Sequence, residues 1–134
     1  MSKLSQVTEE LAAKLLSEVD FSQRLQGTRY HAMAGGMPVV FLQLQEAKDF
    51  LHVGSLQSLL TCGGGGTINY LDWTKLKTWV AEIFGDHELA ESIGKEIAKG
   101  KSFVETMGPM KELLEERLQQ CKELLQYNES PRQI

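Results

Sequence analysis

The sequence predicts a mainly α-helical fold, a single-domain bundle of about six helices with one glycine-rich loop. Apolar residues recur every three or four positions along most of the chain, and helix-capping residues fall between these stretches. Four consecutive glycines, Gly63 to Gly66, make the clearest internal break. With 134 residues, of which 42% are hydrophobic, the chain can bury one core. We expect one domain over residues 1–127 and a flexible tail over residues 128–134.

The N-terminal region predicts two helices. Its apolar residues at helical spacing are Leu4, Val7, Leu11, Leu15 and Val19. They predict an amphipathic helix over about residues 3–18. Asp20 and Gln23 have the spacing of a capping box, and Gly27 offers a left-handed stop, so a short helix is expected over residues 21–26.

The stretch over residues 37–51 fits two periods. Its apolar residues match helical spacing, whereas the end of V-V-F-L-Q-L-Q alternates like a strand. Pro38 suits the first position of a helix, which favours a helix ending near Gly54. The alternative is an α+β fold with one short hairpin, in which residues 39–44 pair with the β-prone residues 67–70.

Caps and stops divide the following region into two helices. Asp72 caps a helix with the densest apolar face in the chain, and Gly85 ends it. Asp86 caps the next helix, which ends near Gly100. The apolar face of the first helix consists of Trp73, Leu76, Trp79, Val80, Ile83 and Phe84, with Trp79 expected in the core.

The C-terminal region predicts a helix that carries a candidate dimer seam. Ser102 forms a capping box with Glu105, and Gly108 followed by Pro109 should stop or kink that helix. A final helix then starts near Met110. Spacings of four, three and four are typical of a helix-pairing seam and occur at Leu114, Leu118, Cys121 and Leu125. A homodimer through this seam is one prediction, and docking of the helix on its own core is the alternative.

The glycine run lacks the lysine and hydroxyl of a nucleotide-binding loop, because Thr67 and Ile68 follow it. A plain connector is favoured over an anion-binding nest at Gly64 and Gly65. Cys62 beside this loop would be a nucleophile if a histidine base reached it. The candidate bases are His31, His52 and His87, so a small enzyme built around the loop is one alternative function.

No complete catalytic, cofactor or metal motif is present in the sequence, because the three histidines are dispersed and the two cysteines lie far apart. We therefore predict no cofactor and no metal, and free thiols at Cys62 and Cys121. No apolar run reaches the about eighteen residues of a membrane-spanning helix, and the start M-S-K-L-S-Q-V-T-E-E is unlike a secretory signal. No membrane association and a cytoplasmic location are expected.

A nucleic-acid partner is a further alternative despite the net charge of -4. Lys95, Lys99 and Lys101 could form a local basic patch. Ala90 and Gly94 have helix-turn-helix spacing, but Gly100 stands where the second helix should bury a branched residue. The full candidate binding surface comprises Trp73, Cys62, Gly64, Gly65, Lys95, Lys99 and Lys101.

Two resemblances can be stated on sequence patterns. The pattern W-V-x4-G-D-x2-L-A-E over residues 79–91 resembles a short prokaryotic family of uncharacterised function, which implies no activity or site. The pattern Y-x4-G-x-M-P-V-V over residues 30–40 is similar to the small all-helical subunit of some CRISPR effector complexes, which implies protein and RNA partners. Taken with the many amphipathic stripes, the sequence favours a protein-protein interaction or regulatory module over an enzyme.

Overall fold

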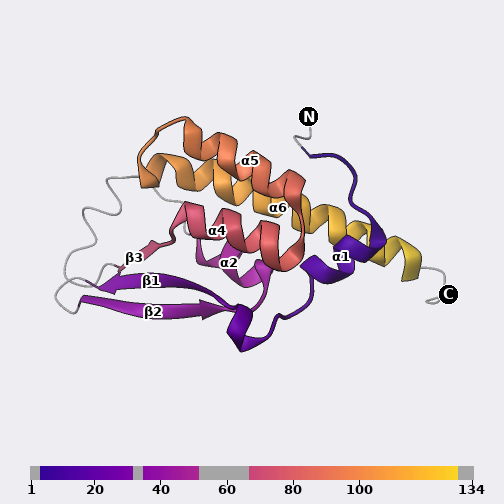
Figure 1. Cartoon of the computed structure of the whole chain (residues 1–134), viewed down its shortest axis with the longest axis horizontal. Helices are drawn as coiled ribbons and strands as arrows, with labels where there is room; N and C mark the ends of the chain where they lie inside the picture. The colour runs from indigo at the N-terminus through magenta and orange to yellow at the C-terminus, as the bar shows by residue number, and fades with distance from the viewer. Residues whose placement is uncertain (1–3, 32–34, 52–66, 130–134) are drawn as a thin grey trace.

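The structure is a computed structural model that describes residues 4–31, 35–51 and 67–129, with the side chains at 31, 67–68 and 126–129 outside the description. The elements in chain order are α1 (Glu9–Leu15), the 3-10 turn η1 (Phe21–Gln23), β1 (Leu25–His31), β2 (Gly35–Phe41), α2 (Leu44–Phe50), β3 (Thr67–Tyr70), α4 (Trp73–Trp79), the π-helical turn η3 (Val80–Phe84), α5 (His87–Ala98) and α6 (Phe103–Glu129). Figure 1 shows helices gathered beside a small sheet, so the described fold is mostly helical with an antiparallel sheet.

The three strands of the sheet lie in the order β2-β1-β3. β1 pairs with β2 along its whole length, with Leu25 opposite Phe41 at one end. β3 is shorter and pairs only with residues 28–31 of β1, with Thr28 opposite Tyr70. The first three residues of β1 therefore have a neighbouring strand on one side only.

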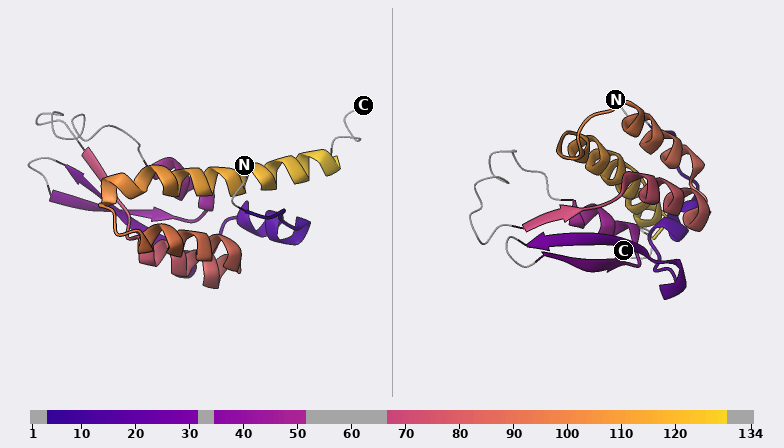
Figure 2. Two further views of the ribbon diagram at one scale, coloured as in Figure 1. Left: turned by 90° about the horizontal axis from the view of Figure 1, so that it is seen from above. Right: turned by 60° about the vertical axis from the view of Figure 1, so that its left-hand side comes forward.

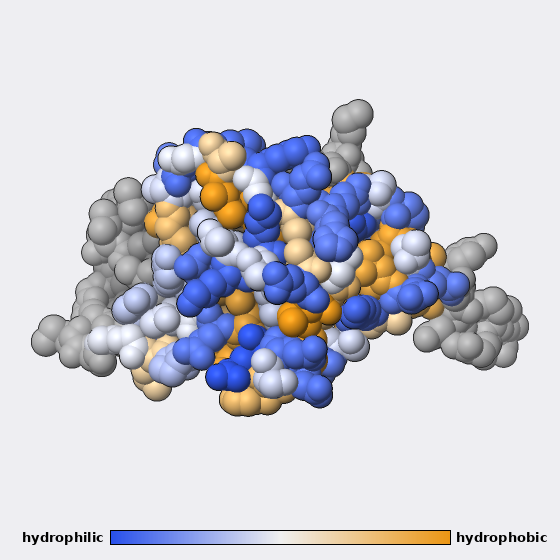
Figure 3. Space-filling model, viewed as in Figure 1, coloured by the Kyte–Doolittle hydropathy of each residue, from blue (hydrophilic) through white to orange (hydrophobic). Residues whose placement is uncertain are grey.

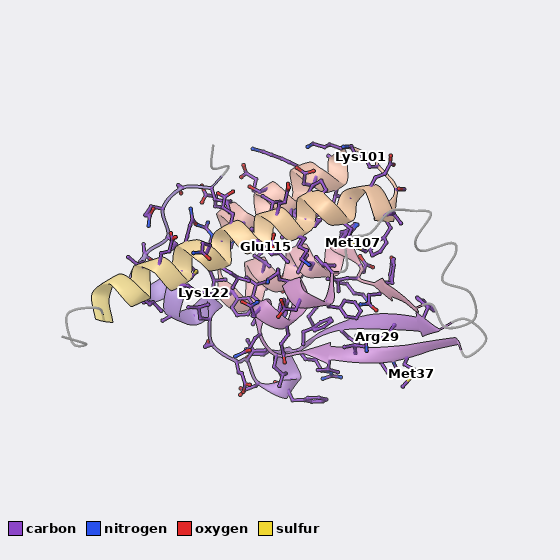
Figure 4. The ribbon with its side chains drawn as sticks, turned by 180° about the vertical axis from the view of Figure 1, so that it is seen from behind. Arg29, Met37, Lys101, Met107, Glu115 and Lys122 are labelled. Atoms are coloured by element: carbon purple, nitrogen blue, oxygen red, sulfur yellow. The ribbon has the colours of Figure 1, made fainter. Side chains whose placement is uncertain are left out.

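The sheet buries one face against α2. Phe41 of β2 meets Phe50 of α2 edge to face, with ring centroids 4.8 Å apart. A side chain at Gly27 would come within 3.1 Å of both rings, so only glycine lets β1 approach this closely. Arg29 lies on the same face, where its Nε donates to Asn69 Oδ1 at 3.1 Å (Figure 4). The sheet is thus joined to the helices through one of its two faces.

Helix α6 is the axis on which the helical part is built. α1, α2 and α5 each pack along it, and Figure 2 shows it running the length of the molecule. The largest fully buried side chains are Arg117, Phe84, Leu15, Leu44, Leu51, Leu71, Leu76, Leu89, Ile93, Met110, Leu113 and Leu114. They come from both halves of the chain, so the described residues share one core.

The prediction of an all-helical bundle is wrong in the first half of the chain. Residues 21–26 form a 3-10 turn and the start of β1, and residues 35–41 form β2 before a helix begins at Leu44. The α+β alternative is closer, because residues 67–70 are a strand. Its pairing is wrong, however, since β1 lies between β2 and β3. L-Q-G-T-R-Y-H has little strand signal of its own, and β1 depends on its neighbours on both sides.

Two helix boundaries also differ from prediction. α1 begins at Glu9, capped by the Thr8 hydroxyl, and the chain before it is not helical although Leu4 and Val7 are buried. Pro109 lies inside α6, which runs unbroken from Phe103. A proline removes one amide donor, and the buried Met107 and Met110 on either side hold the two halves to the core.

The predicted caps in the second half are confirmed. Asp72 accepts a hydrogen bond from the Thr74 amide at 2.9 Å at the start of α4. Gly85, with φ of 75°, ends the turn η3 in the left-handed conformation. Asp86 accepts from the Leu89 amide at 3.1 Å, and Ser102 with Glu105 forms the expected capping box. The sequence therefore predicted the helix ends that are stabilised by local side-chain hydrogen bonds.

Candidate functional site

No described helix covers the face of the sheet opposite α2, and we call it the open sheet face. Alternate residues of each strand point to it. Its described members are Gln26, Thr28, Tyr30, Gly36, Pro38, Val40 and Tyr70. None of these residues is charged, and Tyr30 is 46% exposed, Tyr70 40% and Val40 37%. In Figure 3 the sheet region at lower left is pale rather than the deep blue of the charged helix surfaces.

Close packing between strands sets the shape of this face. A side chain at Gly36 would lie 2.9 Å from the Tyr30 ring and 2.9 Å from Thr28 Cγ2, so the Tyr30 ring rests over Gly36. Pro38 lies opposite Thr28 on the edge strand β2. A proline there removes one amide donor from an exposed edge, which is a common protection against unspecific strand pairing.

An aromatic row continues from the open sheet face toward α6. Tyr70 and Phe103 have ring centroids 4.9 Å apart, and Phe103 stacks on Trp73 at 4.8 Å. Trp73, a predicted binding residue, is half-buried. Its indole Nε1 is buried and has no hydrogen-bond partner among the described residues. The row ties the sheet to the starts of α4 and α6.

A groove of about 540 Å³ separates the start of β1 from α4, and we call it the β1-α4 groove. Its lining residues are Ser22, Gln23, Arg24, Leu25, Gln26, Thr74, Lys75, Thr78, Trp79, Glu82 and Ile83. Trp79 is 4% exposed, and its Nε1 donates to the Gln23 carbonyl at 2.7 Å. The predicted core position of Trp79 is confirmed.

The most buried ionic cluster was not predicted. Arg117 of α6 is 2% exposed and Asp86 is 1% exposed. Arg117 Nε donates to Asp86 Oδ2 at 2.8 Å, and Nη2 donates to Asp86 Oδ1 at 3.2 Å and to Glu88 Oε1 at 2.7 Å. Nη1 donates to the Ser5 carbonyl at 2.9 Å and to Gln120 Oε1 at 2.8 Å. All five guanidinium donors are therefore used.

This cluster is a structural clamp, because no donor of Arg117 is left for a ligand. It holds the N-terminal segment against α5 and α6: the Glu88 carboxylate accepts from the Ser5 amide at 3.1 Å and from the Ser5 hydroxyl at 2.9 Å. These two hydrogen bonds, followed by that from Arg117, lower the pKa of Glu88. The available signal was an arginine in line with Leu113 and Cys121 on an otherwise apolar stripe.

Two of the three lysines of the predicted patch pair with glutamates. Lys95 lies 3.6 Å from Glu91, and Lys99 lies 3.0 Å from Glu96 on the same helix. Lys101 is exposed on the loop before α6, away from the sheet in Figure 4. Two of the three lysines thus have carboxylate partners one turn away, as on an ordinary solvated helix face.

The predicted dimer seam lies inside the molecule. Leu114, Leu118 and Cys121 are at most 1% exposed and pack in the chain's own core, while Leu125 is half-buried. Burial raises the pKa of the Cys121 thiol to about 11. The first three residues are unavailable to a second copy while the chain keeps this fold. Their burial agrees with the alternative prediction, in which this helix docks on the chain's own core.

The glycine-loop hypotheses fall on residues that the structure does not describe. Cys62, Gly64, Gly65 and His52 lie outside the described residues, and so does the side chain of His31. His87 is exposed at the start of α5. Within residues 4–31, 35–51 and 67–129, no group of three histidine, cysteine or carboxylate side chains is placed to hold a metal ion. The anion nest and the Cys62 nucleophile stay predictions.

Comparison with known proteins yields no matching family model, no similar curated protein and no similar solved structure. The segment that carries the likeness to an all-helical subunit contains the strand β2 and is followed by the helix α2. Among the described helices, none combines the length and apolar character that crossing a membrane requires.

Proposed function

We propose that this chain is a protein-interaction module that binds a partner through the open sheet face. The observation that carries the proposal is the absence of charge among the seven described residues of that face, together with the exposure of Tyr30, Tyr70 and Val40. A solvated sheet face in an antiparallel sheet normally alternates with charged or strongly polar residues. Exposed aromatic and aliphatic side chains gathered in one patch are typical of a protein interface.

The chemistry of the other clusters agrees with a binding role. The most buried charges, Arg117 and Asp86, are consumed in the clamp of the N-terminal segment. The lysines of α5 pair with neighbouring glutamates, so they do not favour the nucleic-acid alternative. Tyrosine is enriched in interfaces because a large apolar ring carries a hydroxyl that can find a partner.

The test is site-specific photo-crosslinking in the cells that make the protein. A benzoylphenylalanine at position 30 should give a discrete adduct, and the same residue at position 91, on the exposed side of α5, should give none. Val40→Glu added to the position-30 probe should abolish the adduct, because it places a charge in the patch. Lys77→Gln, which lowers the net charge by the same single unit on α4, should leave it intact. Equal adducts at positions 30 and 91, or none at 30, would contradict the proposal.

A further inference from the structure

The β1-α4 groove contains an interrupted strand pairing. β3 covers β1 only from Thr28 onward, and the chain then leaves the sheet to start α4 at Trp73. By the same register Asp72, the cap of α4, falls opposite Gln26, so no described strand pairs with Gln26 on this side. This leaves the sheet one strand short beside a groove of about 540 Å³, a volume in the range of about 300–1,000 Å³ that ligand sites occupy.

The backbone of Gln26 points into this gap. Successive residues of a strand direct their N–H and C=O groups to opposite neighbours. Pro38 has no amide hydrogen, so its partner Thr28 turns its backbone groups away from β2 and toward β3. Gln26, two residues earlier, turns the same way. On the side of β3, neither the N–H nor the C=O of Gln26 has a hydrogen-bond partner among the described residues.

The walls of the groove indicate what an added strand would carry. Ile83 supplies the accessible apolar surface, while Leu25 and Trp79 are 3% and 4% exposed and lie behind it in the core. Arg24 on the strand side lies over the Phe21 ring and donates to the Phe21 carbonyl at 3.0 Å, whereas Lys75 on α4 forms no ion pair with described residues. Glu82 is the single carboxylate in the lining. The lining therefore has two cations and one anion. Its charge complements an acidic side chain next to an apolar one.

We propose that the β1-α4 groove binds an extended peptide segment of a partner protein, which adds a strand to β1 in line with β3. One peptide residue exchanges two hydrogen bonds with the backbone of Gln26, as in an antiparallel ladder. A neighbouring apolar side chain contacts Ile83, and an acidic side chain pairs with Lys75. This site shares Gln26 with the open sheet face but uses its backbone rather than its side chain, and it does not depend on the interface proposed on Tyr30 and Val40.

The test is to pan a phage library of random octapeptides against the full chain and to synthesise the enriched sequences. We expect them to carry an acidic residue. Thr78→Trp, at an exposed helix position in the groove wall, should raise their Kd about tenfold or more by filling the gap. Hydrogen exchange of the Gln26 amide should slow in the complex, because that amide then donates to the peptide.

Panning against Lys75→Glu should select peptides that lack the acidic residue and carry a basic one. Lys95→Glu makes the same charge change on α5 and should select the wild-type peptides. Tyr30→Ala should leave peptide affinity unchanged, which separates this site from the open sheet face. The proposal is overturned by a library that enriches nothing, by peptides that bind the Thr78→Trp variant as tightly as the wild type, or by an unchanged Gln26 amide.

Discussion

At the scale of single residues, the side chain with the largest consequence is Arg117. It is a buried charge surrounded by acceptors from three parts of the chain: Ser5, the start of α5, and α6 itself. A buried guanidinium is tolerated only when its donors are satisfied, and its removal leaves the partners unpaired. Loss of Arg117 alone should therefore destabilise the protein more than loss of Arg117 together with the charge of Asp86.

Arg117→Met should lower the free energy of unfolding by about 3–5 kcal/mol, because Asp86 is left buried without its partner. The double variant with Asp86→Asn should recover a large part of this loss, since asparagine keeps the cap on α5 without the charge. Urea unfolding of both variants measures the difference. Lys95→Met is the control, an exposed cation with one weak pair. A loss below about 1 kcal/mol for Arg117→Met would contradict the stabilising role of the clamp.

Glu88 should make stability depend on acid pH. Its pKa in the fold lies below the ordinary value of 4.5, because Ser5 and Arg117 hydrogen-bond to the carboxylate. The unfolded chain then binds the proton more readily, so this stabilisation is present above pH 4.5 and is lost as pH falls through the lowered pKa. Glu88→Gln should flatten the acid limb of a plot of unfolding midpoint against pH. An unchanged acid limb would show that the hydrogen bonds to Glu88 do not hold in solution.

At the scale of elements, α4 is fixed to the sheet by Trp79. Its ring meets Phe84 edge to face, with centroids 4.9 Å apart, and its indole N–H holds the carbonyl of Gln23. Trp79→Ala should cost about 3–5 kcal/mol of unfolding free energy, the range for a large aromatic removed from a core. Thermal unfolding followed by circular dichroism measures it, with Thr78→Ala on the exposed side as control. A cost below about 1 kcal/mol would contradict the core position.

The apolar stripe of α6 gives a contrast between two leucines. Leu118 is 1% exposed against the core, whereas Leu125 is half-buried near the end of the described helix. Leu118→Glu should destabilise the monomer itself, because it buries a carboxylate without a partner. Leu125→Glu should leave the fold intact. Urea unfolding measures the stability of each variant, and light scattering measures its oligomeric state. If the wild type is a dimer and Leu118→Glu is folded and monomeric, the result would support the predicted dimer seam.

At the scale of the whole molecule, what the sequence predicted well was local. The caps at Asp72, Asp86 and Ser102 are short-range hydrogen bonds, so the residues that form them lie within a few positions of one another. β1 was missed because its strand character depends on partners elsewhere in the chain and on a glycine at position 27 that lets Phe50 approach. The periodicity of residues 37–51 predicted one helix, whereas this stretch contains the end of β2 and all of α2, with two residues between them.

The candidate site was less predictable than the fold. Tyr30, Pro38 and Tyr70 share a surface only after three strands take one register, which no spacing along the chain reveals. The β1-α4 groove exists because β3 stops three residues short of the start of β1. Of the predicted binding residues that are described, Trp73 lies beside the aromatic row, and the three lysines lie on other elements.

The clamp also has a consequence for the order in which the molecule can be completed during its synthesis. Ser5 and Arg117 are 112 positions apart, so a segment that is synthesised early binds one that is synthesised 112 residues later. Closing so long a loop is entropically unfavourable until the intervening elements have folded. A nascent chain that ends before α6 therefore keeps its N-terminal residues undocked, with Leu4 and Val7 exposed to chaperones and proteases. Closure of the core therefore waits until α6 has left the ribosome.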